Sequence, residues 1–305
     1  NRSQTMRVEW SGCGTALVTP FTENGEVDEA RVRNLAVRQV EAGVRFLVPC
    51  GTTGESPTLS LSEQRQVVEL VVDAANNRIP VLAGAGGYDT KGAIAQVTEM
   101  QRAGANGILS VTPYYNRPTA EGLYRHYLAI AESTTLPIIV YNVPGRTGCN
   151  IDVDTMCRLA EIPNVVGIKE ASGNMAQMCE FCRVAPDEFH VLAGDDIFAL
   201  PLISVGGVGV VSVVSNEVPG EMAHLVSAAL KGDLETARRL HTRLLPLMQL
   251  NFIETNPIPV KAAMAHLGLL KLYYRLPLVP PAPASLAQIV QVLDELTIQR
   301  EPTTS

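Results

Sequence analysis

The chain has 305 residues, of which 46% are hydrophobic and 18% are charged, and its formal net charge is −7. Such a composition is ordinary for a globular protein with a large core. The negative balance argues against nucleic acid or an anionic membrane as the main partner, because both attract proteins through a basic face. The first ten residues hold no apolar leader segment and no stretch reaches membrane-spanning length, so we expect a protein of the reducing cytoplasm.

Eight short apolar runs follow one another along the chain, and each ends in small, polar, glycine or proline residues. They cover 14–20, 45–51, 80–86, 107–113, 137–144, 165–171, 190–196 and 208–216. Near-continuous hydrophobicity is typical of parallel strands that are buried on both faces. We therefore expect eight buried parallel strands.

Amphipathic stretches separate these runs, over 28–42, 60–75, 90–103, 119–133, 152–161 and 174–184. Ser60, with Glu63 three residues later, has the signature of a capping box at the start of the second stretch. Eight alternating units predict a (β/α)8 TIM barrel rather than an open doubly wound sheet. In this fold the active site lies at the carboxyl ends of the strands.

The residues after the eighth run are predicted to form helices, over 219–231, 233–250, 255–267 and 285–298. One of these helices completes the barrel, and the others predict a C-terminal helical extension. We expect the barrel to span 1–232 and the extension, packed on the barrel, to span 233–305. The prolines at 277, 280, 281 and 283 indicate a connector rather than a domain boundary, and the final EPTTS is expected to fray.

Six cysteines are scattered through the chain, at positions 13, 50, 149, 157, 179 and 182. Cys179 and Cys182 form an isolated CxxC on a predicted helix. We interpret the cysteines as free thiols, and a redox or zinc role for the CxxC is the alternative.

Lysine is scarce, and one lysine lies inside an apolar strand. Lys169 sits in VVGIKEA, whereas the others fall in predicted helices or their flanks, at positions 91, 231, 261 and 271. An ionised lysine is almost never buried without a partner. At the carboxyl end of a barrel strand, desolvation favours the neutral amine, which is a nucleophile toward carbonyl carbons. Lys169 is therefore a candidate for Schiff-base chemistry.

Two alternatives to this interpretation of Lys169 stay open. Lys169 could form an internal ion pair with Glu170, although neighbours on a strand face opposite sides. Lys261, in NPIPVKAAMAHLG, is the rival nucleophile, but its predicted helical setting suits a solvated or ion-paired role.

The segment GTTGE, Gly51 to Glu55, follows the second predicted strand. Thr52 and Thr53 can present two hydroxyls and several backbone N–H groups, an arrangement that suits a carboxylate. A tight turn explains the glycines equally well.

Two further segments follow the fifth and fourth strands. In YNVPGRTG, a phenol at Tyr141 near an iminium-forming lysine can shuttle protons, and Arg146 offers a bidentate fork for a carboxylate. Either residue alone is more simply a core tyrosine or a surface arginine. In TPYYNRP, Tyr114 and Tyr115 suit packing, stacking or a subunit contact. A barrel brings all these strand ends to one mouth, and this convergence is stronger evidence than any single motif.

The chain resembles the dihydrodipicolinate synthase/N-acetylneuraminate lyase family over roughly residues 12 to 298. The segments that carry the resemblance are GVRFLVPCGTTGES (43–56), TPYYNRP (112–118), YNVPGRTG (141–148) and VVGIKEASG (165–173). Arg146 favours the synthase branch, because the sialic acid and ketodeoxy-sugar lyases usually differ at this position.

The resemblance implies that pyruvate condenses with L-aspartate 4-semialdehyde to give 4-hydroxy-tetrahydrodipicolinate in diaminopimelate and lysine biosynthesis. Lys169 matches the family's imine-forming lysine, and Tyr141 matches a tyrosine that donates and accepts protons. Thr52 matches the threonine that links Tyr141 to Tyr115 in a proton relay.

The same resemblance implies the binding residues and the assembly. Thr53 would hold the pyruvate carboxylate, and Arg146 would receive the carboxylate of the aldehyde. Val211 falls at the pyruvate contact of the eighth strand, where many members carry isoleucine. Tyr115 would enter from a neighbouring subunit, so we expect a homotetramer, a dimer of dimers. No cofactor or metal is expected, because the five histidines lack ligand spacing such as HExxH and the imine itself supplies an electron sink.

One departure from the family concerns regulation. Lysine-inhibited members bind lysine at a subunit interface through polar and acidic groups. The matching positions here are Leu61, Gln64, Tyr88 and Gly92, and we expect lysine to inhibit weakly or not at all.

Two other functions were weighed. A sister class I aldolase would cleave a 2-keto-3-deoxy sugar acid to pyruvate and an aldehyde, and Arg146 speaks against it. A non-catalytic ligand-binding barrel would not need to retain the lysine, both tyrosines and both threonines.

Overall fold

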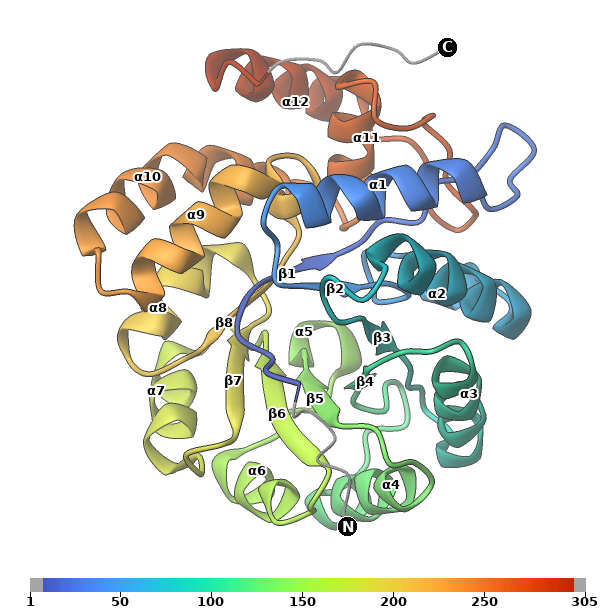
Figure 1. Ribbon diagram of the computed structural model, residues 1–305, viewed down its shortest axis with the longest axis vertical. Helices are drawn as coiled ribbons and strands as arrows, with labels where there is room; N and C mark the ends of the chain where they lie inside the picture. Colours follow the sequence, from blue (N-terminus) through green and yellow to red (C-terminus); the bar gives the residue numbers. More distant parts are fainter. Residues whose placement is uncertain (1–7, 299–305) are drawn as a thin grey trace.

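The computed structural model describes residues 8–298 as a nearly closed barrel of eight parallel strands surrounded by helices (Figure 1). The strands are β1 Gly12–Ala16, β2 Phe46–Val48, β3 Leu82–Gly84, β4 Gly107–Val111, β5 Ile138–Asn142, β6 Val165–Glu170, β7 His190–Ala193 and β8 Gly209–Ser212. The predicted TIM barrel is confirmed.

Seven ladders join the strands in the order β2-β1-β8-β7-β6-β5-β4-β3. The remaining gap is bridged more loosely. Leu47 forms an isolated parallel bridge with Val81, and the Gly84 N–H donates to the Pro49 carbonyl at 2.9 Å. The strands are shorter than their apolar runs because residues at the carboxyl ends leave the ladder and form the loops of the mouth.

Helices cover the outside of the barrel. They are α1 Glu29–Glu41, α2 Leu61–Ala75, α3 Thr90–Arg102, α4 Ala120–Glu132, α5 Pro144–Thr147, α6 Val153–Ala160, α7 Met175–Val184, α8 Ala199–Ser204 and α9 Pro219–Leu230. The capping box at α2 is confirmed, since the Ser60 hydroxyl accepts from the Glu63 N–H at 3.2 Å and the Glu63 carboxylate accepts from the Ser60 N–H at 2.8 Å. The short α5 and α8 were not predicted, because four and six residues carry too little periodicity.

Three more helices follow α9: α10 Leu234–Leu250, α11 Ile258–His266 and α12 Pro283–Glu295. They lie along one side of the barrel, with α12 farthest out (Figure 1). Leu244 of α10 and Ile289 of α12 belong to the same buried cluster as the residues between strands and helices. These helices therefore share one core with the barrel, and the predicted fraying of EPTTS lies outside the described residues.

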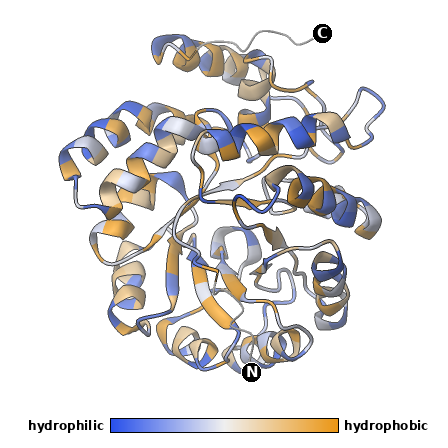
Figure 2. Ribbon diagram, viewed as in Figure 1, coloured by the Kyte–Doolittle hydropathy of each residue, from blue (hydrophilic) through white to orange (hydrophobic). Residues whose placement is uncertain are grey.

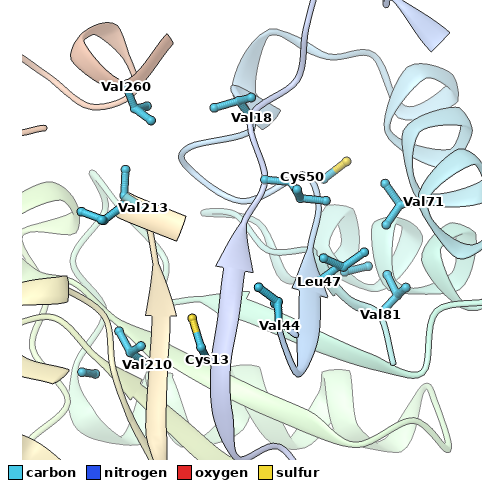
Figure 3. Packing of buried hydrophobic residues seen from close by; sticks show 14 of the residues in the cluster. Cys13, Val18, Val44, Leu47, Cys50, Val71, Val81, Val210, Val213 and Val260 are labelled. Carbon is cyan, nitrogen blue, oxygen red and sulfur yellow. The ribbon is translucent and has the colours of Figure 1, made fainter. Parts of the chain in front are cut away.

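The core has two shells, and apolar residues concentrate on the strands and on the inward faces of the helices (Figure 2). The outer shell lies between barrel and helices. In Figure 3, Cys13 of β1 lies beside its ladder partner Val210, and Leu47 faces Val71 of α2. All six cysteines are free, and burial raises the pKa of the Cys182 thiol of the CxxC to about 11, so the free-thiol interpretation is confirmed.

The inner shell fills the barrel from its amino-terminal end. Trp10, which precedes β1, is fully buried and meets the Phe46 ring edge-on with centroids 5.6 Å apart. Gly107 is required beneath the indole, because a Cβ there would lie 2.5 Å from a Trp10 ring carbon. Within residues 8–298, no helix is long and apolar enough to cross a membrane.

Replacing Trp10 tests whether the packing of its indole stabilises the barrel. Trp10→Ala should lower the free energy of unfolding by about 3–5 kcal/mol, because the indole leaves a cavity that backbone and ring neighbours cannot close. Trp10→Phe is the matched control, and its loss should be smaller. Urea midpoints of the three proteins measure the difference. Equal midpoints for Trp10→Ala and the parent would show that the indole contributes nothing to the free energy of unfolding.

Candidate active site

A cavity of about 100 Å³ opens at the carboxyl ends of the strands. Its lining comes from strands β1, β2, β4, β5 and β6, from the segments that follow β2, β5, β6, β7 and β8, and from the segment between α10 and α11. It comprises Ala16, Val48, Gly51, Thr52, Thr53, Leu109, Tyr141, Val143, Arg146, Lys169, Ala171, Gly194, Asp195, Val213, Phe252 and Asn256. Five residues predicted from the sequence thus meet in one place: Thr52, Thr53, Tyr141, Arg146 and Lys169. Such a cavity is the right size for a small ligand.

Lys169 reaches the cavity from inside the barrel. It lies on β6 opposite Tyr141 of β5, and its side chain is 6% exposed. The Lys169 Nζ lies 3.8 Å from the centroid of the Tyr141 ring. Parallel pairing therefore fixes an amine and a phenol at the same level of the barrel.

Glu170 faces away from the cavity, as strand alternation predicts. Its carboxylate accepts from the Asn142 amide at 2.8 Å and from the Ser172 N–H at 2.8 Å. The ion pair of Lys169 with Glu170 is therefore not formed.

Lys261 does not line the cavity. Its Nζ donates to Glu55 at 2.5 Å and to the Thr19 carbonyl at 3.1 Å, and neither side chain of the pair is exposed. The rings of Phe21 and Tyr274 flank the ammonium at 4.5 and 5.1 Å. Burial lowers the pKa of Lys261, whereas Glu55 opposes this shift. Of the two expected settings of Lys261, the ion-paired one is found and the solvated one is not.

The Glu55–Lys261 pair fastens the GTTGE loop to α11. Glu55 closes the loop with a left-handed backbone, φ +55°, which is uncommon outside glycine. Nearby, the Asn256 amide donates to the Thr53 hydroxyl at 2.9 Å. Two side chains from the C-terminal helical region thus hold this loop at its middle residue and at its last residue.

Arg146 stands at the rim, on the one-turn helix α5. One guanidinium nitrogen donates to the Asn256 carbonyl at 3.1 Å, and the side chain lines the cavity. The fork is thereby held beside the opening with donors left to meet a carboxylate.

Asp195 also lines the cavity and was not singled out from the sequence. Its Oδ1 accepts from the Ile197 N–H at 3.1 Å. Burial raises its pKa, and the Ile197 N–H and the charge of Lys169 lower it. The signal that could have revealed it is the polar pair that ends the seventh apolar run. Asn256 had no such signal, because it follows no strand.

Tyr115 and Val211 are not brought into the cavity lining. Tyr115 is 93% exposed, with φ +71°. Val211, on β8, is buried in the inner shell. No group of three or more potential metal-ligating His, Cys, Asp or Glu side chains occurs among residues 8–298.

Residues 9–296 match the model of the dihydrodipicolinate synthetase family. The chain belongs to this family. A 4-hydroxy-tetrahydrodipicolinate synthase of Koribacter versatilis is 48% identical over 293 residues, which are 96% of this chain and 98% of the relative. A solved dihydrodipicolinate synthase of Aquifex aeolicus has a TM-score of 0.94 and 42% identity, covering 96% of this chain and 100% of that one. The family resemblance inferred from the sequence is confirmed.

A second solved member of this family is similar over the same region. It is the chloride-inhibited dihydrodipicolinate synthase of Acinetobacter baumannii complexed with pyruvate, with a TM-score of 0.93 and 41% identity, covering 94% of this chain and 99% of that one.

Breaking the Glu55–Lys261 pair should be costly. Lys261→Met leaves the Glu55 carboxylate buried without its cation and should lower the free energy of unfolding by about 3–5 kcal/mol. The double variant Glu55→Gln with Lys261→Met removes both charges and should recover much of that loss. Urea midpoints of the single and double variants form a double-mutant cycle, and strictly additive losses would show that the two groups are not coupled.

Proposed function

We propose that this enzyme condenses pyruvate with L-aspartate 4-semialdehyde through an imine on Lys169. The observation that carries the proposal is the amine of Lys169, buried at the end of β6 inside the cavity and set against the Tyr141 ring. The names of the relatives agree with this reaction.

The first step joins pyruvate to Lys169. The neutral amine attacks the ketone carbon, a carbinolamine forms, and loss of water gives the iminium. A proton then leaves the pyruvate methyl group, and the resulting enamine attacks the aldehyde carbon. We assign to the Tyr141 hydroxyl the movement of protons to and from the nitrogen, and the 3.8 Å separation of its ring centroid from the Lys169 Nζ supports this assignment. The pyruvate complex of the Acinetobacter baumannii neighbour supports pyruvate as the first substrate.

Two carboxylates need cationic or amide partners in this reaction. We assign the pyruvate carboxylate to Thr53 and the backbone of its loop, and the aldehyde's carboxylate to Arg146 at the rim. Both residues line the cavity, and Asn256 holds both. Thr52 completes the proposed relay. Val211, which is buried in the inner shell, is the pyruvate contact that the family resemblance implies. A sugar-acid aldolase would have no use for the Arg146 fork, which is why the synthase reaction is preferred.

Tyr115 reaches no site of its own chain, so we propose that it serves a neighbouring subunit in a homotetramer built from two dimers. Its exposed side chain and its left-handed backbone support this assignment, since strain of this kind persists where function requires it. The adjacent Tyr114 is braced edge-on against Tyr88 at 5.3 Å. The cytoplasmic location expected from the sequence stays a prediction.

Trapping tests the central step. Pyruvate with borohydride should reduce the imine to a stable adduct on the peptide that contains Lys169, detected by mass spectrometry. Lys169→Arg is the control, because guanidinium cannot form the imine, and it should give no adduct and no turnover. An adduct on the Lys261 peptide, or no adduct on the parent protein, would contradict the proposal.

Complementation between two inactive variants tests whether Tyr115 enters the active site of a neighbouring subunit. Tyr115→Phe should lower turnover by about 10²–10⁴-fold, the usual loss for a positioned proton shuttle. When this variant is co-assembled with inactive Lys169→Ala, a mixed dimer contains one site with both Lys169 and a neighbour's Tyr115. Activity should then return to about a quarter of the parent value, as random pairing in a two-fold dimer requires. Failure to complement, with Tyr115→Phe itself inactive, would place Tyr115 in its own chain's site.

Free lysine should inhibit weakly. The Gln64 amide is already engaged by the carbonyls of Ser56 and Leu59 at 3.1 and 3.2 Å, and Leu61 and Gly92 offer no side-chain hydrogen bond. Each missing polar contact costs about 1–3 kcal/mol of binding. Initial rates measured against lysine, with both substrates near their Michaelis constants, should therefore change little, and half-inhibition below millimolar lysine would be the contrary result.

A further inference from the structure

The proposed function leaves one charge of the second substrate without a partner. L-aspartate 4-semialdehyde carries an α-ammonium beside its carboxylate, and Arg146 can meet only the carboxylate. The ammonium must also lose a proton before ring closure, because only a neutral amine can attack carbon. A carboxylate in the cavity would serve both needs.

Asp195 is the only acidic residue that lines the cavity formed by the described residues. It comes two residues after the end of β7, and β7 pairs with β6, the strand of Lys169. Between them Gly194 allows close approach, since a Cβ at that position would lie 3.2 Å from the Lys169 Cε and 2.6 Å from the Ala171 Cβ. The Lys169 side chain thus passes against the residue that precedes Asp195.

The Asp195 carboxylate is fixed on one side and available on the other. Its Oδ1 accepts the Ile197 N–H at 3.1 Å, which holds the side chain at the start of the 3₁₀ turn Asp196–Phe198. No hydrogen bond to Oδ2 occurs among residues 8–298. The partly buried setting raises the pKa of Asp195, which makes it a better proton acceptor than a surface aspartate.

The neighbouring Asp196 has a structural role, which distinguishes its carboxylate from that of Asp195. Its Oδ2 accepts from the N–H groups of Val213 and Val214 at 2.9 and 3.0 Å, so it fixes the turn after β8. Asp196 is fully buried and does not line the cavity. The chain therefore uses Asp196 as a structural anchor and presents Asp195 to the ligand.

We propose that Asp195 is a catalytic residue that binds the α-ammonium of L-aspartate 4-semialdehyde and accepts its proton before ring closure. The inference rests on the proposed function and adds a partner for the second substrate. It divides the two charged groups of that substrate between two residues, with Arg146 on the carboxylate and Asp195 on the ammonium.

After the carbon–carbon bond has formed, the adduct is an iminium of Lys169 and still carries the ammonium. One N–H bond of the ammonium breaks, and its proton passes to Asp195. The freed nitrogen lone pair forms a bond to the iminium carbon. A proton then moves from the ring nitrogen to the Lys169 nitrogen, and the bond from carbon to Lys169 breaks with its electron pair going to lysine. The ring nitrogen lone pair forms the new carbon–nitrogen double bond, and its remaining N–H proton leaves to water, as does the proton on Asp195.

Two aldehydes, one with the amine and one without it, test whether Asp195 acts on the ammonium of the second substrate. Succinic semialdehyde has the same carboxylate and aldehyde as L-aspartate 4-semialdehyde but no amine, so it can add to the enamine without closing the ring. The variant Asp195→Asn keeps an acceptor for the Ile197 N–H and removes the base. Its rate with L-aspartate 4-semialdehyde should fall by about 10²–10⁴-fold, whereas addition of succinic semialdehyde to the Lys169–pyruvate imine should be unchanged.

The adduct on Lys169 gives a direct readout. When pyruvate, L-aspartate 4-semialdehyde and cyanoborohydride are all present, Asp195→Asn should accumulate a Lys169 adduct that contains both substrates. The parent protein should release product and yield mainly the pyruvate adduct. Arg146→Ala is the matched control and should impair both aldehydes, because both carry the carboxylate.

Three results would overturn the inference. The first is turnover of L-aspartate 4-semialdehyde by Asp195→Asn at the parent rate. The second is equal impairment of both aldehydes, or loss of the pyruvate adduct, either of which would make Asp195 a partner of Lys169 itself. The third is a parent protein that forms the pyruvate adduct but does not consume L-aspartate 4-semialdehyde, which would refute the proposed function and not Asp195 alone.

Discussion

Parallel pairing of β5 with β6 is the constraint on which the candidate site depends. It sets Tyr141 opposite Lys169, so a phenol and an amine share one level of the barrel and their separation is fixed by backbone hydrogen bonds rather than by flexible loops. Every other group of the site is placed around this pair. Thr53 stands on a loop and Arg146 on the one-turn helix α5, and each is tied to Asn256, a residue that belongs to neither segment.

The barrel interior has two requirements that conflict, because it must be filled for stability and hollow for chemistry. The two requirements are met at different levels along the barrel axis. At the amino-terminal end Trp10 and Phe46 pack in contact, and glycine at 107 gives the indole room. Toward the other end the inward side chains become shorter, as at Ala16 and Val48, and the cavity begins there. A buried lysine is tolerated at that level because its head faces the opening.

The fold and the centre of the site could be predicted from the sequence because both rest on local signals. Period and apolar content reveal buried strands, and a lysine inside such a run is conspicuous. The remaining features depend on tertiary contacts. Nothing local marks Asn256 as a support of Thr53, since 203 residues separate them. Lys261 was expected to be solvated or paired, and only the packed structure shows its partner, Glu55, in a fully buried pair. Asp195 was visible as part of a polar pair, but its proximity to Lys169 depends on Gly194 and on β7 lying beside β6.

The attachment of the GTTGE loop to α11 has a consequence for the order in which the protein becomes active. Lys169 and Tyr141 leave the ribosome well before Asn256 and Lys261, which hold the loop. A nascent chain can therefore assemble most of its strands, with the amine already in place, while the Thr53 loop still lacks both of its supports. The GTTGE loop is thus made early in synthesis and its two supports late, so the cavity is complete only when the last helices pack. A protein cut after the barrel strands would keep Lys169 and Tyr141 and lose both contacts that hold the Thr53 loop.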